Sequence, residues 1–112
     1  MQFFVYFTRN PDTPMKPPSP EGMAEMGKFM MESMEKGLVV STGKLGATTL
    51  VTLQDGELSV TDGPFMEGKE LIPGFTVIEV ESKEQAVEWT TKLRQCMGDG
   101  TLRMAAISTG RG

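Results

Sequence analysis

The sequence predicts a single α+β domain, in which two helices cover one face of an antiparallel sheet. Two observations lead to this fold class. The chain has 112 residues, which is the length of one domain. Its apolar residues follow strand and helix periodicities in the order strand, helix, strand, hairpin, strand, helix, strand. We therefore expect residues 1–112 to form one domain.

The first strand is predicted at residues 2–8, which are rich in aromatic and β-branched side chains. Because this segment is apolar at nearly every position, we expect it to lie inside the sheet. Further strands are predicted at residues 38–41, 74–81 and 101–107.

A hairpin is predicted from two apolar segments, residues 48–53 and 57–61, on either side of Asp55-Gly56. An Asp-Gly pair favours a two-residue type I′ turn. This turn places Leu53 opposite Leu58 and Val51 opposite Val60, so one side of the hairpin is apolar.

The first helix is predicted to begin after Ser19, whose hydroxyl can cap it, and to run to Lys36, where Gly37 ends it. Its methionines predict an apolar core stripe. A copper(I) site is the alternative use for thioether sulfur, but helical spacing favours the core. The stripe comprises Met23, Met26, Met30 and Met34, with Phe29 and Met31 beside it.

The second helix is predicted from a capping box, Ser82 with Gln85, and ends at residues 98–100. Its core stripe comprises Ala86, Trp89, Leu93 and Met97. Helices on one side leave the other face of the sheet uncovered, and a second copy of the chain is the simplest cover. The sequence therefore predicts a homodimer.

Composition excludes several functions. The sequence has no histidine, which excludes Ser-His-Asp and Cys-His catalysis and histidine-built metal sites. A net charge of −4 disfavours direct nucleic-acid binding. The one cysteine, Cys96, cannot form an internal disulfide, and no segment is long and apolar enough for a membrane. We expect a cytoplasmic protein without a bound metal or cofactor.

The segment Val60 to Gly74 reads VTDGPFMEGKELIPG, and its tetrapeptide Asp62-Gly63-Pro64-Phe65 resembles the motif of the DGPF group of the YCII-related family. The preceding hairpin and the following capped helix extend the resemblance over nearly the whole chain. The resemblance implies a ferredoxin-like α+β fold that dimerises into an α/β barrel. It also implies a cleft at the dimer interface.

Asp62 is the principal candidate site residue, as a general base or as a hydrogen-bond acceptor for a small polar molecule. We expect it to be partly buried in a pocket that the first strand also reaches. The alternative is an Asx-turn that only shapes the chain. The other candidate ligand-binding residues are Tyr6, Arg9, Gly63, Pro64, Phe65, Lys69 and Glu70.

The resemblance leaves open whether the protein is an enzyme. The wider family's suggested catalytic pair is histidine with aspartate, and this sequence has no histidine. Ala105 and Ala106 stand where relatives carry an Arg-Pro pair. Any catalysis would be carboxylate acid–base chemistry without metal. The alternative function is a non-catalytic regulatory module linked to transcription initiation, which contacts sigma-factor-like proteins rather than DNA.

Overall fold

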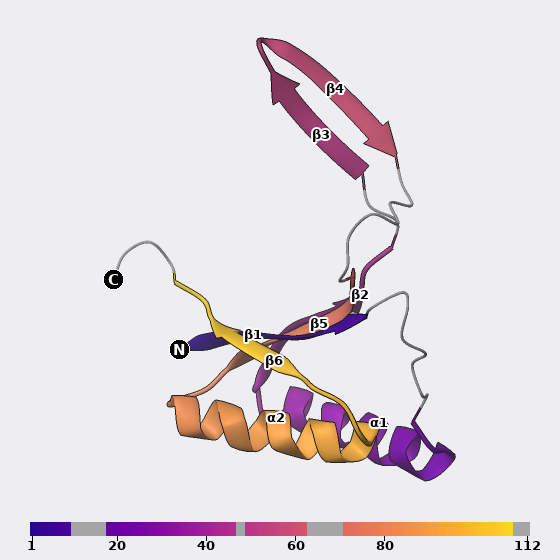
Figure 1. Cartoon of the computed structure of the whole chain (residues 1–112). Helices are drawn as coiled ribbons and strands as arrows, with labels where there is room; N and C mark the ends of the chain where they lie inside the picture. The colour runs from indigo at the N-terminus through magenta and orange to yellow at the C-terminus, as the bar shows by residue number, and fades with distance from the viewer. Residues whose placement is uncertain (10–17, 47–48, 63–70, 109–112) are drawn as a thin grey trace.

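A computed structural model describes residues 1–9, 18–46, 49–62 and 71–108, and only the backbone of residues 8–9 and 71–73. Six strands and two helices form an α+β fold, as the sequence predicts (Figure 1). The elements are β1 (Gln2–Arg9), α1 (Pro20–Glu35), β2 (Val39–Lys44), β3 (Thr49–Gln54), β4 (Glu57–Asp62), β5 (Leu71–Glu79), α2 (Lys83–Met97) and β6 (Arg103–Ala106).

The main sheet has four antiparallel strands in the order β2-β5-β1-β6, with both helices on one face (Figure 1). The prediction that the first strand lies inside the sheet is confirmed, since β1 pairs with β5 on one side and β6 on the other. Alternate residues of β1 point to opposite faces. Phe3 and Val5 are buried on the helix side, and Phe4 and Tyr6 lie on the opposite side. The described strands do not close into a barrel within one chain.

We call the side without helices the outer face. The register of β1, β5 and β6 places on it, among others, Phe4, Tyr6, Phe75, Val77, Arg103 and Ala105. Three of the rings form one cluster, with ring centroids 5.2 Å apart between Phe4 and Tyr6 and 5.6 Å apart between Phe4 and Phe75. No described element covers this aromatic surface (Figure 1).

The core lies between the helix-side face of the sheet and the helices. The stripe predicted on α2 is confirmed: Ala86, Trp89 and Leu93 are buried, and Met97 packs half-buried at its edge. The capping hydroxyl of Ser82 accepts the amide hydrogen of Gln85 at 3.1 Å, as the capping box predicts. The other buried apolar side chains are Phe3, Val5, Ile78 and Val80.

Helix α1 corrects the predicted methionine stripe. Met26, Phe29 and Met30 pack against the core, but Met23, Met31 and Met34 are 49–65% exposed. The buried position near the end of α1 belongs to Ser33 instead, whose hydroxyl accepts the indole N–H of Trp89 at 2.9 Å. The stripe is only partly buried because the side of α1 that packs against α2 and the core carries Met26, Phe29, Met30 and Ser33. The predicted cap at Ser19 is confirmed.

Strands β3 and β4 form a separate hairpin, which we call the arm (Thr49–Asp62). Its turn and register are as predicted: Asp55 and Gly56 have φ of 53° and 79°, and Leu53 pairs with Leu58. The arm extends away from the sheet (Figure 1), and the chain's radius of gyration is 16.6 Å. A compact chain of this length would have about 13 Å.

Candidate functional site

Asp62 is the last residue of β4, at the base of the arm. Its Oδ1 accepts the hydroxyl of Thr49 at 2.9 Å, which closes the open end of the hairpin. In the described chain Asp62 is exposed rather than partly buried. The reason is that β3 and β4 pair only with each other, so the arm does not join the main sheet that contains β1.

Of the other predicted site residues, the structure describes only Tyr6 and Arg9. Tyr6 lies on the outer face beside Phe4, in a sheet that the arm with Asp62 does not join. Arg9 is the last residue of β1 and its backbone pairs with Leu71. The structure therefore does not bring Tyr6 and Asp62 together within one chain. Gly63, Pro64, Phe65, Lys69 and Glu70 lie outside the described residues.

A cleft of about 470 Å³ lies between α1, α2 and the sheet. We call it the methionine cleft, because four of its lining residues are Met23, Met26, Met30 and Met97. Tyr6 borders it as well, but the register places the Tyr6 ring on the outer face. A volume of this size is within the range of small-molecule sites.

Glycines leave the space that forms this cleft. Gly27 on α1 has nothing within 4 Å of where a Cβ would lie. On β5, a Cβ at Gly74 would lie 3.3 Å from the Phe7 ring, so glycine gives that ring its room. The cleft therefore has a glycine on its helix wall and another on its sheet wall.

The cleft has few polar groups. The hydroxyl of Thr42 already has partners within the sheet: it donates to the Phe75 carbonyl oxygen at 3.0 Å and lies 3.0 Å from the Thr76 hydroxyl. Lys44, at the end of β2, is the one charged side chain among the described lining residues. It is exposed, and it forms no ion pair within the described part of the chain. The site thus combines an apolar wall with a single positive charge.

The sequence did not point to Lys44, because the strand predicted at residues 38–41 ends before it. The structure continues β2 to Lys44, pairing Thr42 with Thr76 and Lys44 with Gly74. A signal was present, since a strand extended through Lys44 places Thr42 and Lys44 on the same face.

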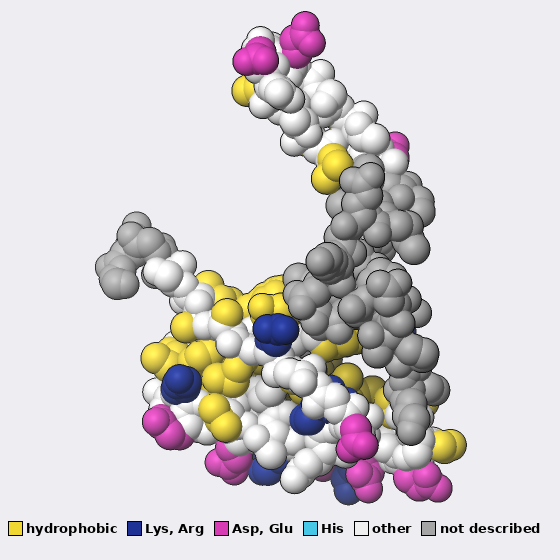
Figure 2. All heavy atoms as spheres, in the orientation of Figure 1, with side chains coloured by type: hydrophobic (Ala, Val, Ile, Leu, Met, Phe, Trp, Pro, Cys, Tyr) yellow, Lys and Arg dark blue, Asp and Glu magenta, His cyan; other side chains and the backbone are white. Residues whose placement is uncertain are grey.

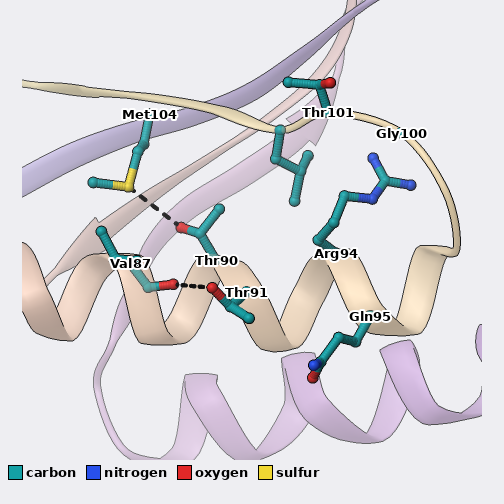
Figure 3. A pocket seen from close by; sticks show the side chains of 9 residues that line it. Val87, Thr90, Thr91, Arg94, Gln95, Gly100, Thr101 and Met104 are labelled. Atoms are coloured by element: carbon teal, nitrogen blue, oxygen red, sulfur yellow. Dashed lines mark hydrogen bonds between the residues drawn. The ribbon is translucent and has the colours of Figure 1, made fainter.

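A second cleft, of about 390 Å³, lies between α2 and β6 (Figure 3). Its charged side chain, Arg94, donates from Nε to the Gly98 carbonyl at 2.8 Å and from Nη2 to the Asp99 carbonyl at 3.3 Å. These bonds cap the end of α2, so the guanidinium is already used by the fold. Thr90 and Thr91 also bond within the chain, to Met104 and Val87 (Figure 3). This cleft is a weaker candidate for a ligand site.

Cys96 is half-buried, and burial raises the pKa of its thiol, to which the carboxylate of Glu25 adds a smaller effect in the same direction. A raised pKa lowers the thiolate fraction near neutral pH and makes the thiol a poor nucleophile. Among the described residues, no group of three Cys, Asp or Glu side chains could hold a metal ion. Neither described helix is long and apolar enough to cross a membrane.

The sheet order and the two helices on one face define a small α+β protein of the ferredoxin-like class. The chain belongs to the YCII-related domain family, whose model matches residues 1–103, which confirms the resemblance to this family. No curated protein matches the chain. Among solved structures it is similar to the periplasmic divalent cation tolerance protein CutA from Archaeoglobus fulgidus. The identity is 18% and the TM-score 0.40, over 100% of this chain and 87% of that chain.

Proposed function

We propose that this protein binds a small amphipathic anion, such as a medium-chain or aromatic carboxylate, in the methionine cleft. The observation that carries the proposal is an apolar cavity of about 470 Å³ with Lys44 as its one described charged residue. Binding sites for small molecules are commonly apolar, with a few polar groups that fix the orientation of the ligand.

The chemistry of the lining supports this ligand class. Methionine side chains are flexible and polarisable, so they adapt to apolar ligands of different shape. Met26 and Met30 are half-buried and Met23 is exposed, so the helix wall offers apolar surface to a ligand. An ammonium group at the edge of such a wall attracts a carboxylate as a point charge. The apolar body of the ligand would lie against the methionines and its carboxylate at Lys44.

Decanoate and decanol test this ligand class, because they share an apolar chain and differ in charge. We expect Lys44→Met to weaken decanoate binding by about 3- to 10-fold and to leave decanol binding unchanged, because only the ion contact is lost. Isothermal titration calorimetry measures both affinities. Lys36→Met is the matched control. Lys36 caps the C-terminal end of α1 and does not line the methionine cleft. Equal losses in the two lysine variants, or no binding of either ligand to the wild type, would contradict the proposal.

We propose a second, separate role for Asp62 as an acceptor or general base for a small polar molecule, without metal. Oδ1 accepts the Thr49 hydroxyl, and no described residue donates to Oδ2. A carboxylate oxygen without a donor can accept a hydrogen bond from a ligand. The Asx-turn alternative assigns Asp62 only the contact with Thr49 and the turn that follows.

Thr49→Val separates the two interpretations of Asp62, because it removes the contact and keeps the carboxylate. In a thermal-shift screen of polar metabolites, we expect a compound that stabilises the wild type to stabilise Thr49→Val as well. Its affinity for Asp62→Asn should fall by about tenfold or more, because the charged acceptor is lost. Equal stabilisation of all three proteins, or no compound that stabilises the wild type, would leave Asp62 with a structural role alone.

We also propose that a second copy covers the outer face, which would make a homodimer of the barrel type. The cluster of Phe4, Tyr6 and Phe75 supports it, since an uncovered aromatic surface of this kind favours burial. The same surface is compatible with the alternative function, a regulatory module that contacts a sigma-factor-like protein. Measuring the mass in solution distinguishes the two, because only the first gives a dimer of this chain alone. The cytoplasmic location stays a prediction.

A further inference from the structure

The arm carries an apolar face that nothing in the described chain covers. The register of the hairpin places Val51, Leu53, Leu58 and Val60 on one side, and these side chains are 63–71% exposed. Thr49 and Asp62 lie at the base of the same side. A two-stranded hairpin is marginally stable in water by itself. An arm with this face left in water therefore lacks the packing that would hold it in place.

The shape of the molecule indicates what could cover this face. Figure 1 shows the helices on one side of the main sheet and the arm extending on the other, the side of the outer face. Figure 2 shows an open space between the arm and the body of the molecule. A second copy seated on the outer face would enter this space and lie beside the arm. One placement thus brings a second copy to both the outer face and the arm.

The charges of the two surfaces are complementary. The arm carries Asp55, Glu57 and Asp62 and has no lysine or arginine. The outer face carries Arg103, next to Tyr6 in the register. The acid at the edge of that face, Glu79, is paired with the amino terminus at 3.1 Å. Glu57 lies on the opposite side of the arm and Asp55 in its turn, so Asp62 is the acid that the outer face of a second copy would meet.

We propose that the arm is a dimerisation element whose apolar face packs against a second copy of this chain. The inference rests on the homodimer proposed above and adds the arm as a second contact. In a twofold dimer each contact is made twice, so both arms are covered and the assembly closes at two copies. Covering the apolar face also takes Asp62 out of water, which would give that carboxylate the partly buried setting that the single chain lacks.

A charge swap on the arm tests the proposal. In Leu53→Lys with Leu58→Glu, the new side chains face each other, so a cross-strand ion pair preserves the hairpin while the apolar face is lost. Thr52→Lys with Ser59→Glu is the matched control, because it places the same pair on the opposite side of the same strands. Analytical ultracentrifugation measures the dimer dissociation constant. We expect at least a 30-fold increase for the apolar-face variant and less than about a threefold change for the control.

Ala105→Lys, on the exposed outer face, separates this inference from the homodimer itself. A dimer that Ala105→Lys weakens, while both arm variants dissociate like the wild type, would overturn the arm and leave the outer-face dimer standing. A wild type that is monomeric at tens of micromolar would overturn both and assign the arm to a different protein. No described arm residue belongs to the core and the arm does not join the main sheet, so circular dichroism should show wild-type helix content in both arm variants.

Discussion

Gly22→Ala is expected to lower the free energy of unfolding by about 1–3 kcal/mol, although alanine is the better helix former. Gly22 is buried in the first turn of α1, where the helix crosses the last turn of α2. A Cβ at this position would overlap the backbone carbonyl oxygen of Cys96. A carbonyl held in a helix cannot turn aside as a flexible side chain can, so the two helices would have to separate. Thermal or urea unfolding, followed by circular dichroism, measures the loss.

Gly27→Ala is the control, because it makes the same chemical change five residues further along α1. A Cβ at Gly27 has nothing within 4 Å, and the residue is exposed. Alanine there should raise the free energy of unfolding by about 0.5–1 kcal/mol through helix propensity. The difference between the two variants isolates the contact of the helices. If Gly22→Ala were as stable as Gly27→Ala, the two helices would not approach as closely as described.

Ser33→Ala is expected to cost about 1–3 kcal/mol, because it leaves a buried donor without an acceptor. The indole N–H of Trp89 donates to Ser33 Oγ at 2.9 Å, and the hydroxyl of Ser33 donates to the Phe29 carbonyl at 2.8 Å. Both residues are at most 5% exposed, so the loss of the acceptor leaves a buried N–H without its protein partner. The sequence has one tryptophan, so its fluorescence reports both the unfolding transition and the local environment.

Thr91→Ala is the matched control for Ser33→Ala. Its hydroxyl makes the same kind of bond, donating to the Val87 carbonyl four residues earlier at 2.7 Å, but it is exposed and no indole depends on it. Its effect should stay within about 0.5 kcal/mol of zero. In a Trp89→Phe background, Ser33→Ala should cost much less, because no N–H remains to be left unpaired. An unchanged cost in that background would show that the hydroxyl stabilises the fold in some other way.

Much of the local structure was predictable because its causes are local. The turn at Asp55-Gly56 and the cap at Ser82 depend on residues within a few positions of one another, and both form as expected. The buried stripe of α2 was also predictable, since the residues on one face of that helix pack in the core with residues of the sheet. The family assignment followed from the DGPF motif and the order of the elements.

The methionines of α1 show that a helical pattern does not determine how much of a helix face is buried. Their spacing marks one helix face, but it does not say how much of that face reaches the sheet. The packing of α1 against α2 buries Ser33 beside Trp89 and leaves Met31 exposed. The sequence around Ser33 does not indicate that this residue is buried. The N–H donor that its hydroxyl accepts belongs to Trp89, which is 56 residues away.

The candidate site shows the same division. The sequence marked Asp62 by its motif, but not that the hairpin would stand apart from the main sheet and carry Asp62 away from Tyr6. The methionine cleft was not predictable either, because its walls come from both helices and three strands. Gly27 and Gly74 both line it, and the sequence does not show that these two glycines lie on different walls of one cleft.

The sequence by itself determined the element order, the hairpin register, the caps and the absence of histidine chemistry. Each depends on contacts between near neighbours in the chain or on composition alone. Only the tertiary structure decided which apolar surfaces are buried, because burial depends on packing between segments far apart in the chain. That packing left the outer face and the arm uncovered and opened the cleft at Lys44.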